Sequence, residues 1–161
     1  MEPPGRLRYR WHTLCERHVF EFNLALAYSG QAVEQFEASP KHPLTDTGAP
    51  KALGVYALYL TKADKSPIYV GKATKITLTR RLAEHATKIA GRQNIDVAGV
   101  WCRYLVIGAK PGEQWVAASA ESALIHEYKP KWNKSGFGGH VPGAGRPGKD
   151  AVPWDTWYPK K

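Results

Sequence analysis

Six polar residues of this chain have the types and the spacing that phosphodiester hydrolysis requires. Two tyrosines lie thirteen positions apart, each in a triplet with valine and glycine. An arginine and a histidine follow at helical i,i+4 spacing, and a glutamate and an asparagine come later in the chain. Such a set combines a metal-binding carboxylate, a phosphate-binding cation and groups that transfer protons. In chain order the six are Tyr56, Tyr69, Arg81, His85, Glu121 and Asn133.

Glu121 is the most informative of the six, because it lies on the apolar stripe of an expected helix. Its helical neighbours at −4, +3 and +7 are Ala117, Leu124 and Tyr128. A buried carboxylate without a partner is costly, so Glu121 must be protonated, paired with an arginine or lysine, or bound to a metal. The ion pair is the alternative reading; together with the other five residues, we expect a divalent metal ligand. A single carboxylate supplemented by water suits Mg²⁺, for which Mn²⁺ can substitute.

Arg81 and His85 lie one turn apart on the same face of a helix. The planar guanidinium of Arg81 can hold a phosphate oxygen and offset the charge of a pentacovalent phosphorane. His85 is expected to titrate near neutrality and to take a proton from a water. The neighbouring Arg80 and Glu84 are expected to form a solvated helix face.

The tyrosines and the asparagine each have a structural alternative. Tyr56 shares a strand face with Leu58 and Leu60, so we expect its ring to be packed and its hydroxyl to be presented. That hydroxyl could orient the attacking water or act as a base, whereas strand tyrosines are often simply core residues. Asn133 follows a helix end, where it either forms a turn or positions a phosphate or a metal-bound water.

The elements that must position these residues can be read from hydrophobic periodicity and from glycine and proline. Residues 20–38 are expected to be partly helical and residues 39–52 to form a loop. An apolar strand, a polar turn and a second strand then form a hairpin, and two helices with one intervening strand follow. The expected bounds are 53–61, 62–66 and 67–71 for the hairpin, 77–90 for the first helix, 99–107 for the third strand, 108–112 for a turn and 113–128 for the second helix.

Composition indicates one domain that binds a polyanion. The 161 residues carry a formal net charge of +9, with a pI of about 9.6. DNA, RNA or an acidic membrane would attract such a chain. Cys15 and Cys102 match no metal-binding or disulfide pattern, so we expect two free thiols in a cytosolic protein. No signal peptide and no membrane-spanning stretch is recognisable.

The two ends of the chain have distinctive compositions. Residues 1–19 interleave arginines with Tyr9 and Trp11, as in a DNA-contacting arm or a solvated terminus. From Gly136 onward glycine and proline dominate, which indicates a disordered tail or a loop ordered by a partner. Residues 143–150 nearly spell a P-loop, but Asp150 stands at the Ser/Thr position and no strand precedes the segment, so a nucleoside triphosphatase is rejected.

The ordered set over residues 53–133 resembles the GIY-YIG nucleases, with valine replacing isoleucine in both triplets. The resemblance implies an α/β (α+β) fold, a small three-stranded antiparallel sheet flanked by helices. It also implies that Glu121 binds the metal, that Arg81 is the helix arginine and that Asn133 is the terminal asparagine. The implied reaction is single-metal hydrolysis of double-stranded DNA, in which His85 or Tyr56 deprotonates water and Tyr69 and Asn133 fix the phosphate.

Further runs resemble the type II restriction endonucleases of that family, specifically those that cut CCGCGG. These runs are residues 81–85, 128–133, 136–146 and 154–155. The resemblance implies a homodimer on a GC-rich palindrome, a cognate methyltransferase, and a cytoplasmic enzyme of a prokaryote or phage. Residues 1–52 would then be an arm and dimerisation segment, 53–133 the catalytic core and 134–161 a DNA-contacting tail, although 20–38 could instead only cover one sheet face. The DNA-contacting residues would be Lys72, Arg80, His140, Arg146 and Lys149.

Three other functions compete with restriction. A structure-specific repair or mobile-element endonuclease would keep the same core but leave no palindromic cleavage pattern. A catalytically silent DNA-binding module would use the basic surface alone, but all six site residues are present. An RNA-binding protein ranks last, because no stacking-platform signature is found.

Overall fold

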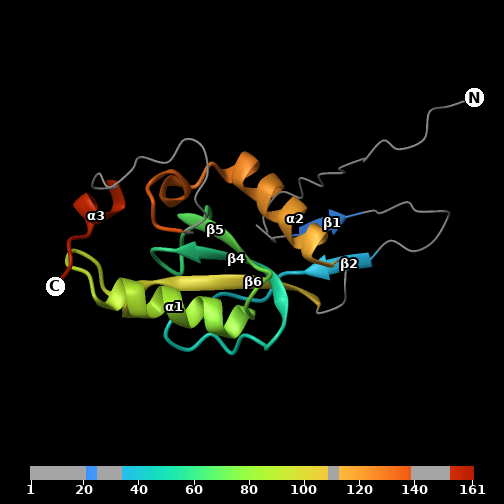
Figure 1. Cartoon of the computed structure of the whole chain (residues 1–161), viewed down its shortest axis with the longest axis horizontal. Helices are drawn as coiled ribbons and strands as arrows, with labels where there is room; N and C mark the ends of the chain where they lie inside the picture. The colour runs from blue at the N-terminus through green and yellow to red at the C-terminus, as the bar shows by residue number, and fades with distance from the viewer. Residues whose placement is uncertain (1–20, 25–33, 109–112, 139–152) are drawn as a thin grey trace, which may run out of the picture.

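A computed structural model describes residues 21–24, 34–108, 113–138 and 153–161 of the chain (Figure 1). Its centre is a four-stranded antiparallel sheet with the strand order β3-β6-β4-β5. The expected three strands are therefore joined by a fourth, two-residue strand at one edge. The strands are β3 (His42–Pro43), β4 (Leu53–Tyr59), β5 (Tyr69–Ala73) and β6 (Trp101–Gly108).

Helices α1 (Leu78–Ala90) and α2 (Glu113–Tyr128) cover opposite faces of this sheet (Figure 1). Alternate residues of the central strand β4 point to the two sides, as strand geometry requires. Val55 and Ala57 pack with the α2 side, whereas Tyr56 and Leu58 pack with the α1 side. The expected face sharing of Tyr56 and Leu58 is thus confirmed, and it places Tyr56 under α1.

Both helices begin and end where the sequence predicts. The Thr77 hydroxyl caps α1 by accepting a hydrogen bond from the backbone N–H of Arg80, and Gly91 follows the last turn. Helix α2 spans 113–128, after which Lys129 adopts a positive φ of 47° and Pro130 prevents continuation.

Four strand boundaries differ by two residues from those expected: β4 ends at Tyr59 rather than at residue 61, and β5 ends at Ala73 rather than at residue 71. β5 begins at Tyr69 rather than at residue 67, and β6 begins at Trp101 because Val97–Gly99 form a short 3-10 helix, η1. The side chain of Asp96 caps that turn by accepting from the Ala98 N–H. The pairing of β4 with β5 places Tyr56 opposite Gly71 and Leu58 opposite Tyr69.

Where the structure describes residues 20–38, the expected partial helix is wrong. Strands β1 (Glu21–Leu24) and β2 (Glu34–Glu37) pair antiparallel in a second sheet, with Phe22 opposite Phe36. Polar and apolar residues alternate in Glu21–Leu24, and backbone pairing of the two strands outweighs the weak helical spacing. Residues 25–33 lie outside the described part of the chain.

The glycine-rich C-terminal region ends in an element that composition did not predict. Helix α3 (Pro153–Trp157) starts at a proline, which the first helical position tolerates. Its Trp154 is fully buried against Trp132 and Phe137, and Trp132 belongs to the 3-10 helix η2 (Lys131–Lys134). Packing of aromatic rings therefore orders this end of the chain.

Several sequence expectations fall on residues that the structure does not describe. These are the N-terminal arm, Cys15, the turn at 109–112 and the near-P-loop at 143–150. Cys102 is described, and it is buried with a free thiol. Within the described ranges, none of the helices combines the length and the apolar character needed to cross a bilayer.

Candidate active site

Tyr56 and Tyr69 meet His85 between the sheet and α1. The Tyr56 hydroxyl lies 2.6 Å from Nε2 of His85, and the His85 ring is 5.4 Å from the Tyr56 ring and 5.5 Å from the Tyr69 ring. Each of the three side chains is more than nine-tenths buried. The structure thus brings together three of the six expected residues, from three different elements.

Burial fixes the protonation of this group. It lowers the pKa of His85 to about 3, and the positive charges of Arg81 and Lys88 act in the same direction. Burial also raises the pKa of Tyr56 well above its usual value. The Tyr56 hydroxyl and the neutral His85 ring therefore share one hydrogen bond, in which the hydroxyl donates when the His85 proton is on Nδ1. The expectation that His85 titrates near neutrality is wrong for the protein without DNA, because it assumed a histidine ring in contact with solvent.

Two glycines allow backbone to approach the tyrosine hydroxyls. A Cβ on Gly71 would lie 2.5 Å from the Tyr56 hydroxyl, and one on Gly138 would overlap the hydroxyl of Tyr69. Burial, followed by the negative charge of Glu121, raises the pKa of Tyr69 to about 12. Both phenols are consequently neutral donors at physiological pH.

Phe137 is a site residue that the sequence did not single out. Its ring stacks on His85 at 4.8 Å between centroids and meets the Tyr69 ring edge-on at 4.9 Å. The Lys88 ammonium donates to the Phe137 carbonyl oxygen at 2.5 Å and also lies over its ring. The only signal in the sequence was an aromatic residue between two glycines, which does not specify a partner.

Arg81 is held in place by Glu84. The Nη1 atom of Arg81 lies 3.0 Å from Oε2 of Glu84, and Nε of the more exposed Arg80 lies 3.4 Å from the other oxygen. Glu84 therefore orients the expected phosphate-binding arginine, so the prediction of a merely solvated face is too simple. The charge of Arg81 still reaches the buried group, since it adds to the lowering of the His85 pKa by burial and partly offsets the rise of both tyrosine pKa values.

Glu121 reaches from α2 toward the edge strand β5, where it forms an ion pair with Lys72. The ion pair was the alternative to metal binding, and it is present in the structure. No cluster of three or more metal-binding side chains occurs among the described residues. A single carboxylate that is 18% exposed, and that already faces a cation, nevertheless has the charge and access that a largely hydrated divalent ion needs.

Asn133 clamps the outer edge of β5. Its Oδ1 accepts from the Val70 N–H at 2.9 Å, and its Nδ2 donates to the Val70 carbonyl oxygen at 2.7 Å. The neighbouring Trp132 N–H donates to the carbonyl oxygen of Ile68 at 2.9 Å. The amide of Asn133 therefore holds the strand that carries Tyr69.

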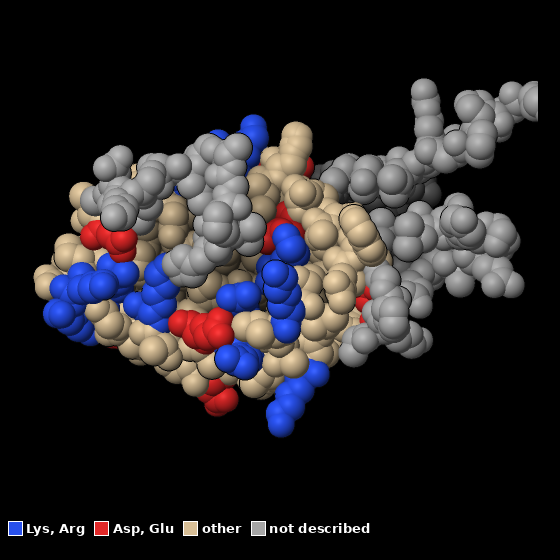
Figure 2. Space-filling view, in the orientation of Figure 1, with Lys and Arg blue, Asp and Glu red and all other residues tan. Residues whose placement is uncertain are grey.

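Of the five residues expected to contact DNA, the structure describes Lys72 and Arg80. Both have solvent access, and Arg80 is 73% exposed. Figure 2 shows lysine and arginine side chains gathered over α1 and between α1 and α2, with acidic side chains interspersed among them. His140, Arg146 and Lys149 lie outside the described residues.

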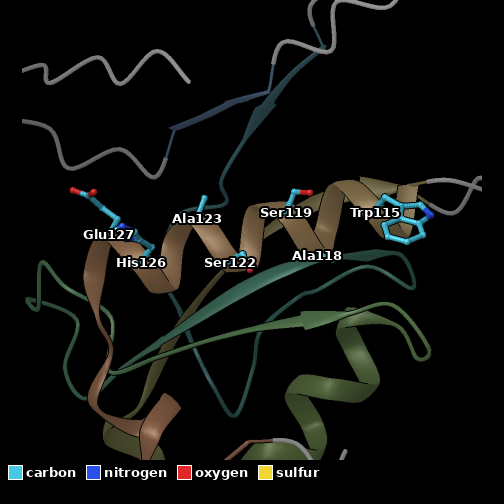
Figure 3. A pocket seen from close by; sticks show the side chains of 7 residues that line it. All are labelled: Trp115, Ala118, Ser119, Ser122, Ala123, His126 and Glu127. Carbon is cyan, nitrogen blue, oxygen red and sulfur yellow. The ribbon is translucent and has the colours of Figure 1, made fainter. Parts of the chain in front are cut away.

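A separate pocket lies on the outer side of α2, away from this group. Trp115 and His126 mark its length, and small residues such as Ala118, Ser119 and Ser122 line it between them (Figure 3). Trp115 is 79% exposed. None of the six expected site residues contributes to the pocket, so its shape does not bear on their chemistry.

A comparison with protein-family models identifies the family to which the chain belongs. The model of the Eco29kI GIY-YIG domain, a restriction endonuclease family, matches residues 72–161, more than half of the chain. The chain belongs to the Eco29kI GIY-YIG family. It is therefore a GIY-YIG nuclease related to type II restriction enzymes, and DNA is its substrate. A search of curated proteins returned no match.

The Eco29kI family match begins at Lys72, so it contains Arg81, His85 and Glu121 but neither motif tyrosine. The structure connects the two parts, because Tyr56 and Tyr69 contact His85 directly. The candidate site is therefore assembled from residues on both sides of the match boundary.

Proposed function

We propose that this nuclease is a type II restriction endonuclease that cleaves double-stranded DNA at a GC-rich palindrome, CCGCGG being the best candidate sequence. The family match supports restriction activity, and the resemblance of residues 136–146 to CCGCGG-cutting enzymes supports the choice of site. Arginine commonly reads guanine through O6 and N7, so Arg146 is the proposed base-contacting residue. Lys72, Arg80, His140 and Lys149 are proposed as further DNA contacts.

The hydrogen bond between Tyr56 and His85 is the observation that carries the mechanism. The Tyr56 oxygen takes a proton from the attacking water as its own proton passes to Nε2 of His85. The resulting hydroxide attacks the phosphorus in line, the bond from phosphorus to the 3′ oxygen breaks, and that oxygen takes a proton from solvent water. Because the pKa of His85 is about 3 without DNA, the negative phosphate must be present to favour its protonated form.

Glu121 would hold one Mg²⁺, which supplies Lewis-acid stabilisation of the phosphate and of the leaving oxygen. Arg81, oriented by Glu84, neutralises charge that develops on the phosphate. The Tyr69 hydroxyl donates to the scissile phosphate. Asn133 acts through β5, because its amide holds the backbone of Val70 next to Tyr69. The products are 5′-phosphate and 3′-hydroxyl ends.

A palindromic target requires two such sites related by a two-fold axis, so we propose a homodimer. Residues 20–38, which contain β1 and β2, are the proposed interface. A restriction role further requires a methyltransferase that protects the host's own copies of the site.

Plasmid cleavage tests this function directly. The purified protein and its Glu121→Ala variant are incubated with plasmid DNA and Mg²⁺, and the fragment ends are sequenced. We expect discrete, Mg²⁺-dependent fragments that share one palindrome and that the variant does not produce. Scattered or structure-directed nicks lost in the variant would favour a repair-type endonuclease, and binding without any cleavage would leave a DNA-binding module.

A matched pair of tyrosine variants tests the proton relay. Tyr56→Phe removes the hydroxyl that donates to His85, and we expect cleavage to fall at least about 100-fold, the usual contribution of a general base. Tyr59→Phe removes a buried hydroxyl from the same strand but from its α2 side. The Tyr59 variant is expected to retain most of its activity. Equal losses in the two variants would contradict the relay.

A further inference from the structure

The ion pair between Lys72 and Glu121 occupies the position at which the proposed function requires a metal. Lys72 lies on β5, directly after Gly71, and its ammonium contacts Oε2 of Glu121. The carboxylate is 18% exposed and the lysine side chain 37% exposed. The glutamate is thus held in a partly desolvated place, while the lysine keeps access to solvent.

Lys72 is the cation that balances Glu121 among the described residues. The nearby Arg81 directs its guanidinium to Glu84, and the Lys88 ammonium is bonded to the Phe137 carbonyl oxygen. No ion pair of Glu121 with either of them is found. A carboxylate that is mostly shielded from water needs such a counter-charge.

A lysine ammonium and a divalent ion cannot both contact the same carboxylate oxygen, because the two cations repel each other at that separation. Binding of the ion must therefore displace the ammonium. The lysine has a flexible four-carbon stem, and its backbone neighbour Gly71 lies against the Tyr56 hydroxyl. A displaced ammonium remains beside the proposed reaction centre, where an anionic phosphate would attract it.

We propose that Lys72 is a positioning residue that exchanges partners during assembly of the active complex. It neutralises Glu121 before the metal binds and is transferred to the DNA phosphate when the metal takes its place. Metal binding and DNA binding are thereby coupled, each favouring the other. This inference rests on the proposed function, because it takes Glu121 as the metal ligand.

Mn²⁺ binding to the full chain without DNA tests the exchange independently of cleavage. Isothermal titration at pH 8 compares the wild type with Lys72→Met, Lys72→Gln, Glu121→Gln and the control Lys75→Met. Lys75 is exposed and makes no ion pair with described residues. Circular dichroism establishes that each variant is folded.

We expect both Lys72 variants to bind Mn²⁺ about twofold to fivefold more tightly than the wild type, since no ion pair has to be broken. Lys75→Met should bind like the wild type, and Glu121→Gln should lose most of the affinity. Unchanged or weaker binding in both Lys72 variants, with loss in Glu121→Gln, would overturn the exchange alone. Undiminished binding in Glu121→Gln would overturn both the exchange and the proposed metal ligand.

The coupling between metal binding and DNA binding is measured separately. Both proteins carry Tyr56→Phe, which suppresses cleavage of the DNA. Fluorescence anisotropy gives the affinity for duplex DNA with and without Mn²⁺. We expect Mn²⁺ to strengthen DNA binding several-fold more when Lys72 is present than when it is methionine. An equal effect of Mn²⁺ in the two backgrounds would show that Lys72 does not couple the two ligands.

Discussion

His85 is the proposed proton acceptor in catalysis, and its surroundings disfavour its positively charged form. Its ring is stacked on Phe137, bonded to the Tyr56 hydroxyl and close to the positive charges of Arg81 and Lys88. The folded protein therefore keeps His85 neutral. A solvated histidine, with a pKa of about 6.5, would take up a proton at mildly acidic pH. The difference between the two states makes stability depend on pH.

The sign of this dependence follows from the lowered pKa. Between pH 6.5 and about 3 the unfolded chain binds a proton at His85 that the folded protein does not bind, so stability falls as pH falls. We expect the wild type to lose about 2 kcal/mol more than His85→Gln between pH 7.5 and 5. Urea unfolding at the two pH values measures the difference.

The control for this prediction is His126→Gln, which changes an exposed histidine on α2. It should lose as much stability as the wild type over the same pH range. Equal losses in the wild type and in His85→Gln would show that burial does not hold His85 neutral.

At the scale of elements, β5 is an edge strand whose position depends on residues that follow α2. Asn133 satisfies both backbone groups of Val70, much as a neighbouring strand would. Tyr69 on one side of Val70 and Lys72 two residues beyond it are both proposed to act on DNA. The geometry of the candidate site therefore depends on the side chain of Asn133, which lies 63 positions after Val70 in the sequence.

Removal of the clamp is expected to loosen β5. Asn133→Ala leaves the Val70 N–H and carbonyl groups without their partners, which should cost about 1–3 kcal/mol of stability. The Val70 amide should exchange with deuterium at least about tenfold faster by NMR. Gln93→Ala, which removes an exposed hydrogen bond to Lys160, should leave that exchange unchanged. Unaltered Val70 exchange in Asn133→Ala would contradict the clamp.

Elements with local signals could be predicted from the sequence. Thr77 and Gly91 bound α1, and Pro130 closes α2, because caps and helix breakers act within a few residues. The segment containing β1 and β2 was mispredicted, since four-residue strands carry too short a pattern to outweigh a helical spacing. Helix α3 was missed because Trp154 is held by rings that are distant in the sequence.

The site could be predicted as a set of residues but not as a set of contacts. Chemical type and order indicated Tyr56, His85 and Glu121, whereas the partner of Glu121 lies 49 positions away on β5. Nothing local marks Lys72 as that partner. Burial also had to be known before the pKa of His85 could be given a direction.

For the whole molecule, the net charge of +9 predicts that DNA affinity depends steeply on salt. The logarithm of the binding constant should fall linearly with the logarithm of salt concentration. Arg80→Gln, on exposed α1, should reduce the slope by about 1. Anisotropy titrations from 50 to about 300 mM salt give the slope.

Lys41→Gln is the control for the salt titration. The Lys41 ammonium lies over the ring of Tyr59, which faces the opposite side of the sheet from α1. This variant should keep the wild-type slope. If Arg80→Gln also kept the wild-type slope, the result would show that Arg80 does not contact a phosphate.

Part of each edge of the four-stranded sheet has its backbone groups occupied in the described part of the chain. Asn133 and Trp132 cover β5, while at the other edge β3 pairs with β6 and Ser39 bonds to the N–H and the carbonyl oxygen of Tyr104. Only short runs of N–H and C=O groups are left with which a second molecule could extend this sheet. The proposed dimer is therefore expected to form through other surfaces, and strand addition at this sheet is a poor route to aggregation.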